Sequence, residues 1–395
     1  MNESAQKPDK KRFPADLLNQ TPDERVAYFW KHTSGHRYLN ESAETFLDVV
    51  VDPAGANILI VYGPPGVGKT TLLEIARRAI IERSRVALVA DPGYVPIVGL
   101  PAVSMGLPTF NWPDYWSRAL VALNEPLVAD KRLPRAAARL SQPAAEWPFA
   151  RKDTRANLLL AWEHALHERR VQAVLIDEAQ HIFFGLSGRA LQRQLDCVKS
   201  QADRTGVLHV LAGTYELLTA RNLNAQLTRR SVDIHFPRYR REVAEDVKVF
   251  QSVVGIFQRH LPLPEEPDLL GQWEFLYERS AGCVGTLKEW LTKSLATATR
   301  QEKPMAVWDK YLVKYAHSRP AALKMLESAR RAEADLAEAE EEAEEKLPRL
   351  LSTPLQRRKR SPAAPTAPAP AKRRKRPVGE RAPGRDPVME VSNAN

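Results

Sequence analysis

The chain has 395 residues, enough for about two or three domains, and 44% of them are hydrophobic, enough to build a core. Its formal charge of +10 belongs mostly to one end, because residues 349–395 hold twelve Lys/Arg and three Asp/Glu. The sequence has no apolar signal core near its start and no run of about 18 apolar residues, so we expect no secretory leader, no membrane span and a cytoplasmic protein.

The first half of the chain begins like an α/β protein. A polar arm at 1–20 precedes a helical pattern that starts at Thr21, a good N-cap, with Pro22 at the first helical position. A helix at 41–50 and an apolar, β-branched strand at 57–62 follow. After a glycine-rich loop come a helix at 71–84 and a predicted strand at 85–90. Strand, loop, helix and strand predict a doubly wound α/β fold with a parallel sheet.

The second half adds the remaining strands and a helical region. Residues 91–156 are proline-rich and contain an aromatic cluster with helical spacing at 115–123, and an amphipathic helix covers 157–170. Further strands are predicted at 171–176, 207–212 and 231–236. We expect these domains: a flexible arm (1–20), an α/β domain (21–240), a small helical lid (241–320), a charged helix (321–347) and a disordered basic tail (348–395).

The loop after the first strand matches the phosphate-binding pattern GxxxxGK[ST] in full. Its residues are Gly63, Pro64, Pro65, Gly66, Val67, Gly68, Lys69 and Thr70, with Thr71 next in the helix. Glycines let the backbone wrap a phosphate with its N–H groups pointing inward. Lys69 should reach the β- and γ-phosphates, and Thr70 should place its hydroxyl on Mg²⁺. The sequence therefore predicts a site for ATP and Mg²⁺.

A second motif lies downstream, where the apolar run at 174–176 ends in Asp177 and Glu178. Asp177, at the carboxyl end of its strand, would hold Mg²⁺ through water, and Glu178 would orient and polarise the attacking water. His181 lies just beyond. It could contact the nucleotide or DNA, but we interpret it as an ordinary structural histidine.

Three further positions have the residue types of ATPase sensors. Thr214 follows the strand at 207–212, where ring ATPases sense the γ-phosphate; a turn threonine is the alternative. Arg229 or Arg230 could reach the γ-phosphate of a neighbouring subunit, with Arg221 a weaker candidate and a solvated basic pair the alternative. Lys288 begins a lid helix and could fold over the nucleotide, or it could be an exposed lysine.

These motifs together resemble the AAA+ transposition regulators of the TniB/TnsC/MuB group, over about residues 40–300. The matching stretches are YGPPGVGKTTLLE, VLIDEAQHI, VLAGTYEL, the LTRRS pair, AGCVGTLKEWL and the aromatic WPDYWSRALVALNEP. The resemblance implies an AAA+ P-loop ATPase that assembles with ATP into a ring or helical filament on double-stranded DNA. That homo-oligomer would mark the target site and recruit and activate a transposase. A target-selector protein or an RNA-guided targeting complex would load it. The long region 91–156 and the basic tail depart from the family pattern.

Two basic regions are candidates for DNA phosphate contacts. The first surrounds the aromatic segment and comprises Arg118, Lys131, Arg132, Arg151, Lys152 and Arg155. Its aromatic residues, Trp112, Tyr115 and Trp116, could equally be core packing. The second is a helical face with Arg189, Arg193 and Lys199, which could also be an ordinary solvated face.

Two other functions remain open from the sequence. A helicase-loader or replication-initiator AAA+ ATPase would share the motifs, although no basic recognition helix follows residue 300. A degenerate nucleotide-binding scaffold would not need its intact Lys69, Asp177 and Glu178. A Glu178→Gln variant separates an ATPase, which would lose turnover, from a scaffold, which would not change.

Overall fold

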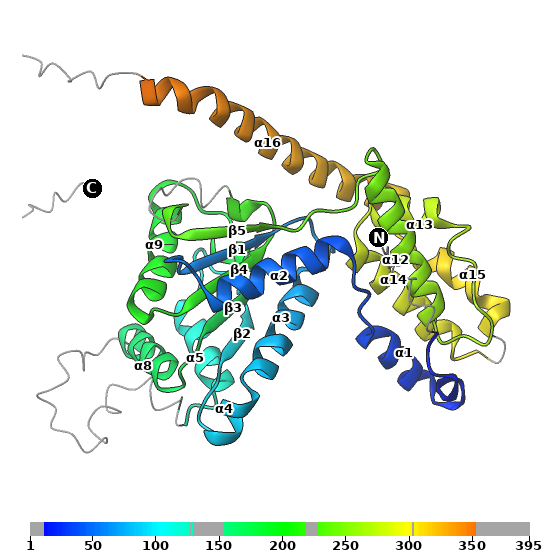
Figure 1. Cartoon of the computed structure of the whole chain (residues 1–395), viewed down its shortest axis with the longest axis horizontal. Helices are drawn as coiled ribbons and strands as arrows, with labels where there is room; N and C mark the ends of the chain where they lie inside the picture. Colours follow the sequence, from blue (N-terminus) through cyan, green and yellow to red (C-terminus); the bar gives the residue numbers. More distant parts are fainter. Residues whose placement is uncertain (1–11, 127, 129–153, 219–227, 302–303, 353–395) are drawn as a thin grey trace, which may run out of the picture. The chain divides into compact units, whose positions relative to one another are not determined.

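A five-stranded parallel sheet lies at the centre of the structure, a computed structural model that describes residues 12–126, 128, 154–218, 228–301 and 304–352. Its strands are β1 (Ile58–Tyr62), β2 (Ile97–Pro101), β3 (Ala173–Asp177), β4 (Leu208–Gly213) and β5 (Ser231–His235). The spatial order is β2-β3-β4-β1-β5, and all neighbours are parallel (Figure 1). The carboxyl ends of β1, β3 and β4 therefore meet at one edge of the sheet.

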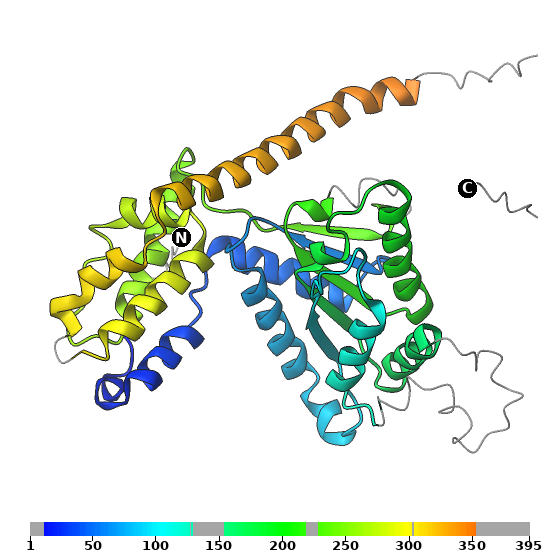
Figure 2. The ribbon, with the colours of Figure 1, turned by 180° about the vertical axis from the view of Figure 1, so that it is seen from behind.

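Helices cover both faces of the sheet, as its continuous apolar strands require. On one face are α2 (Arg37–Val51) and α3 (Lys69–Arg83), and on the other α5 (Trp112–Ala122), α8 (Thr154–Glu168) and α9 (Gly188–Thr205) (Figures 1 and 2). All six residues of β4 are buried between them. The predicted doubly wound α/β fold is confirmed, and four of the predicted strands match β1, β3, β4 and β5 to within two residues.

The predicted strand at 85–90 is wrong. These residues form a short helix, α4 (Arg85–Ala90), in which no residue is buried; Val86 and Val89 are 84% and 81% exposed. The second strand of the sheet is instead β2, which begins at Ile97 and lies at the edge of the described sheet beside β3. Pro101 has no N–H to donate, and an edge strand tolerates it because one side of the strand needs no ladder partner.

The aromatic rings of the segment after β2 belong to the core of the α/β domain. Trp112, Tyr115 and Trp116 are buried between α5 and the helices beside it. The indole N–H of Trp112 donates to Gln194 at 2.7 Å, and that of Trp116 donates to Gln201 at 2.8 Å, both on α9. The core-packing alternative is therefore the correct one for these rings.

A second, helical core lies in the residues after the sheet. Its helices are α12 (Ala244–His260), α13 (Trp273–Ser280), α14 (Val284–Ala298) and α15 (Pro304–Tyr315), together with α1 (Pro22–Lys31) from the start of the chain. Phe29 of α1 is fully buried in this core, and Thr21 caps α1 as expected, through a capping box with Glu24. A short helix, η1 (Ala15–Asn19), precedes α1. None of the described helices is long and apolar enough to cross a membrane.

The last helix, α16 (Arg319–Ser352), belongs partly to the first structural unit (1–336) and partly to the second (337–395). The first turns of α16 are held by an ion pair with Arg238, which follows β5 and is 2% exposed. The guanidinium of Arg238 donates to both carboxylate oxygens of Glu333, each at 2.9 Å. Such a bidentate pair is directional as well as strong. It fixes the first turns of α16 to the segment between the sheet and the lid helices.

Candidate active site

The phosphate-binding loop connects the end of β1 to the start of α3 at the carboxyl edge of the sheet. Gly66 and Gly68 have φ of 74° and 118°, backbone conformations that favour glycine. Gly63 is also constrained, because a Cβ there would lie 2.0 Å from the carbonyl oxygen of Phe236. The loop is therefore held against the end of β5, with its glycines where the sequence predicts them.

Lys69 is buried at the centre of this loop. Its ammonium donates to the carbonyl oxygens of Gly63 at 3.0 Å and Pro64 at 2.9 Å. Burial lowers the pKa of Lys69, whereas the nearby carboxylates of Glu178 and Asp177 act in the opposite direction. The side chain is thus placed among the loop carbonyls and close to the acidic end of β3.

The two predicted metal-binding residues are in direct contact. The hydroxyl of Thr70, at the start of α3, donates to Oδ2 of Asp177 at 2.7 Å. A hydroxyl and a carboxylate side by side are hard oxygen donors of the kind that Mg²⁺ takes from a protein, with phosphates and water as its other ligands. The residues therefore fit the ion that the sequence predicts.

Glu178 follows in an uncommon backbone conformation, with φ of 51°. Its own N–H donates to Oδ1 of Asp177 at 2.9 Å. A left-handed conformation of a residue other than glycine stores strain, and such residues are frequent at functional sites. Glu178 is exposed, and it begins the short helix η3 (Ala179–Ile182), which contains the half-buried His181.

A residue that the sequence analysis did not single out, Gln180, connects Glu178 to the end of β4. Its amide nitrogen donates to Oε2 of Glu178 at 2.5 Å, and its oxygen accepts the N–H of Thr214 at 3.3 Å. The hydroxyl of Thr214 is buried and has no hydrogen-bond partner among the described residues. The only sequence signal for Gln180 was its place beside the acidic pair.

The lid helix α14 begins directly on the phosphate-binding loop. The N–H of Thr286 donates to the carbonyl oxygen of Gly66 at 2.8 Å. A Cβ on Gly285 would lie 2.6 Å from the same oxygen, so only glycine allows this approach. Lys288 follows on the same helix, half-buried, with its ammonium 5.7 Å from the ring centre of Trp30. Burial lowers the pKa of Lys288 to about 8.

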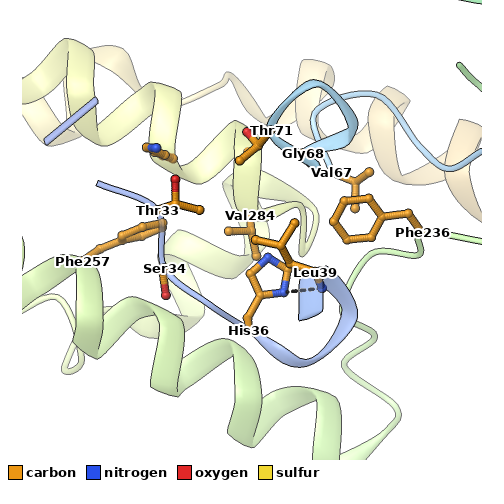
Figure 3. Close-up of a pocket in the computed structure, with 12 residues that line it drawn as sticks. Thr33, Ser34, His36, Leu39, Val67, Gly68, Thr71, Phe236, Phe257 and Val284 are labelled. Atoms are coloured by element: carbon orange, nitrogen blue, oxygen red, sulfur yellow. Dashed lines mark hydrogen bonds between the residues drawn. The ribbon is translucent and has the colours of Figure 1, made fainter. Parts of the chain in front are cut away.

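A cavity of about 30 Å³ lies beside the loop (Figure 3). Four segments line it: the turn before α2 with the start of that helix, the loop with the start of α3, the residue after β5, and the lid. Its residues are Thr33, Ser34, His36, Leu39, Val67, Gly68, Thr71, Phe236, Phe257, Val284, Gly285 and Lys288. His36 caps α2 and accepts the hydroxyl of Tyr239 at 2.8 Å, and burial lowers its pKa to about 4, so the ring is neutral near pH 7.

The candidate trans arginines lie just before β5, at the amino end of that strand, whereas the phosphate-binding loop lies at the carboxyl ends of the strands. Both are exposed, and Arg230 forms an ion pair with Asp203 of its own chain. The sequence treated the two as equivalent, and the structure separates them.

The candidate DNA residues have mixed outcomes. Arg118 pairs with Asp114 at 2.8 Å, and Arg155 contacts Cys197. Arg189 and Arg193 are exposed on α9, and Lys199 is half-buried there. Other predicted positions lie outside the described residues, namely Lys131, Arg132, Arg151, Lys152, the alternative finger Arg221 and the tail from 353 onward.

Comparisons with known proteins address the α/β domain. Residues 52–220 match the family described as AAA domain. A search of curated proteins finds no significant match. Among solved structures, the ORC2 protein of Aeropyrum pernix in ADPNP–ADP complexes is similar at 15% identity and a TM-score of 0.41. The match covers 73% of this chain and 66% of that chain, so this chain spans just under two thirds of that protein's length.

Two further structures are similar at comparable levels. The Walker-type ATPase paby2304 of Pyrococcus abyssi has 15% identity and a TM-score of 0.39, with 78% of this chain and 76% of that chain covered. Domain III of the Thermotoga maritima replication initiation protein DnaA has 13% identity and a TM-score of 0.38, with 76% and 95% covered. None of these comparisons names a transposition protein, so the TniB/TnsC/MuB resemblance stays a prediction. The AAA domain match, the parallel sheet and the loop at its edge together show that this chain has the AAA+ P-loop fold.

Proposed function

We propose that this chain is an ATPase that binds ATP with Mg²⁺ and hydrolyses it to ADP and phosphate. The observation that carries the proposal is the hydrogen bond of 2.7 Å between Thr70 and Asp177, which joins two motifs 107 residues apart in the sequence. Neither a glycine turn nor an acidic strand end alone would require this contact. A shared role in holding one metal ion and one triphosphate explains it.

Each residue has a distinct role in this proposal. Backbone N–H groups of the loop and the ammonium of Lys69 bind the β- and γ-phosphates. Thr70 and Asp177 would hold Mg²⁺, which supplies positive charge at the phosphate oxygens. Glu178 accepts a hydrogen bond from the attacking water and orients it. The unpartnered hydroxyl of Thr214 is available to donate to the γ-phosphate.

The cavity beside the loop is the proposed position of the adenine ring. As it stands, about 30 Å³ accommodates one water molecule, so the ring would have to displace the turn before α2 or the start of α14. The turn lines the cavity together with loop residues, and the start of α14 donates a hydrogen bond to Gly66 of the loop. Lys288 lies on α14 at the wall of the same cavity, where its charge would bind a phosphate oxygen. Nucleotide binding would therefore involve the lid as well as the α/β domain.

We propose that the active form is a homo-oligomer, either a ring or a helical filament. Both arginines are exposed, and Arg229 is the proposed finger for a neighbouring γ-phosphate because Arg230 is paired with Asp203. A finger must leave its own subunit, and a residue that first has to break an ion pair is the weaker candidate.

The further proposal is that the oligomer forms on double-stranded DNA and regulates transposition, by marking a target and recruiting a transposase under the control of a target selector or an RNA-guided complex. The sequence resemblance supports it, as do the exposed Arg189 and Arg193 on α9 and the basic tail. A protein with these partners would act in the cytoplasm. The alternative is a helicase-loader or replication-initiator ATPase, a class represented among the compared structures by one titled replication initiation protein. Binding to a replicative helicase, measured against binding to a transposase, separates the two.

The ATPase proposal is tested with the full chain, double-stranded DNA, and ATP or ADP. Wild-type protein should release phosphate and form ordered assemblies on DNA with ATP only. Glu178→Gln should lose turnover by about 100-fold or more and keep the assemblies, because it still binds ATP and Mg²⁺. Lys69→Ala should lose both.

Two outcomes would contradict the proposal at different levels. Phosphate release that is unchanged in Glu178→Gln would refute hydrolysis at this site. Hydrolysis without any ATP-dependent assembly on DNA would leave the ATPase intact and overturn the DNA-linked role. Arg204→Ala is a suitable control, since this exposed residue pairs with Glu163 away from the site.

A further inference from the structure

Gln180 lies between the proposed catalytic carboxylate and the strand that carries Thr214. It is 8% exposed, and both ends of its carboxamide are used: Nε2 donates to Glu178 at 2.5 Å, and Oε1 accepts the N–H of Thr214 at 3.3 Å. A carboxylate can only accept and a backbone N–H can only donate, so only one orientation of the amide satisfies both.

The end of β4 is shaped to receive this amide. A Cβ on Gly213 would lie 2.3 Å from Oε1 of Gln180 and 3.0 Å from Leu217, so any larger residue would displace the carboxamide. The φ of Gly213 is not in the left-handed region, so its backbone does not require glycine. The requirement comes from the space that Gln180 occupies.

We propose that Gln180 is a positioning residue that couples the end of β4 to the carboxylate of Glu178. The inference rests on the proposed ATPase function, in which Thr214 binds the γ-phosphate and Glu178 orients water. When the hydroxyl of Thr214 engages phosphate, any shift of its backbone N–H moves the carboxamide and therefore the carboxylate. Because Glu178 has a strained φ of 51°, its position depends on such outside support.

The test compares Gln180→Glu with wild type in the full chain. This substitution keeps the size of the side chain and an acceptor for Thr214, but it removes the donor to Glu178 and puts a negative charge beside it. We expect kcat for ATP hydrolysis to fall by at least about 10-fold at pH 8, with the Kd for ATP within about 3-fold of wild type, because positioning affects the chemical step.

The split between kcat and the Kd for ATP distinguishes positioning from a merely structural role. A structural defect would lower the stability and weaken ATP binding, whereas loss of positioning lowers kcat alone. The matched control is Gln201→Glu, since Gln201 is also buried, at 3% exposure, and also uses both amide ends, but on Trp116 and Cys197. It should lower stability and leave kcat within about 3-fold of wild type.

A second variant tests the same contact without adding charge. Gly213→Ala should displace the carboxamide of Gln180 and lower kcat by a similar factor, and it carries the test if Gln180→Glu fails to fold. A wild-type kcat in the variant that folds would overturn the coupling, as would a deficit in Gln180→Glu that lies in the Kd for ATP and not in kcat. If wild-type protein does not hydrolyse ATP, or if Glu178→Gln retains turnover, the proposed function fails instead.

Discussion

The contact between α14 and the phosphate-binding loop leads to a counterintuitive prediction for Gly285→Ala. Gly285 is helical, and alanine in a helix is normally more stable than glycine by about 0.5–1 kcal/mol. Here, however, the new Cβ would lie 2.6 Å from the carbonyl oxygen of Gly66 and 3.2 Å from the amide nitrogen of Gly68. These are backbone atoms, and they cannot rotate away.

The size of the effect follows from these distances. A comfortable carbon–oxygen contact is about 3.3–3.6 Å, so the helix and the loop must separate by roughly 0.7 Å. That separation would stretch the bond from Thr286 to Gly66, now 2.8 Å, to about 3.5 Å, where little of it remains. Losing a buried hydrogen bond costs about 1–3 kcal/mol, more than alanine contributes. We expect a net loss of about 1 kcal/mol in stability and about 5-fold weaker ATP binding.

Thermal unfolding and the affinity for a fluorescent ATP analogue would measure both effects. Gly255→Ala is the matched control, because Gly255 also lies in a lid helix but the atoms nearest its new Cβ are side-chain atoms at 3.4 Å and beyond. That control should be neutral or slightly stabilising. The reasoning is refuted if Gly285→Ala melts at or above the wild-type temperature and binds ATP with unchanged affinity.

Three further predictions concern charge. Burial lowers the pKa of Lys288 to about 8, so affinity for ATP should fall as the pH rises from 7 to 9, and Lys288→Arg should flatten that profile in equilibrium titrations. Burial lowers the pKa of His209 to about 4, so the unfolded chain takes up the proton first as the pH falls. The contribution of His209 to the free energy of unfolding is complete above about pH 6.5 and should decline by up to about 1.4 kcal/mol per pH unit as the pH falls to about 4. In urea unfolding, His209→Gln should show a shallower dependence of this free energy on pH. Arg229→Ala should lower the ATPase rate of assembled protein by about 100-fold or more, whereas Arg230→Ala should affect it far less; equal losses would contradict the assignment of the finger.

Sequence patterns predicted the parts of the fold in which apolar runs are truly buried. The stretch at 57–62 and the runs ending in Asp177 and Gly213 are strands because helices cover both their faces. The run RVALVA is also apolar but forms the exposed helix α4. Its strand prediction was wrong because a short apolar segment has no periodicity that distinguishes helix from strand. The real strand, β2, was missed because its Gly99 and Pro101 read as loop residues, and only its place at the sheet edge permits them.

In the candidate site, too, some residues could be predicted from the sequence and others could not. A motif fixes residue types and spacing, so Lys69, Thr70 and Asp177 could be assigned before their contacts were known. The role of Gln180 depends on a hydrogen bond across 34 residues, which no local pattern contains. Likewise, only the ion pair with Asp203 separates Arg230 from its neighbour Arg229.

The ion pair between Arg238 and Glu333 determines where this protein can be shortened. Ending the chain before Glu333 would deprive the guanidinium of Arg238, which is 2% exposed, of its carboxylate partner. An unpaired buried charge costs about 3–5 kcal/mol, a large part of the stability of an ordinary domain. A truncation intended to isolate the ATPase from its tail should therefore keep the first four turns of α16, even though most of that helix is solvent-exposed.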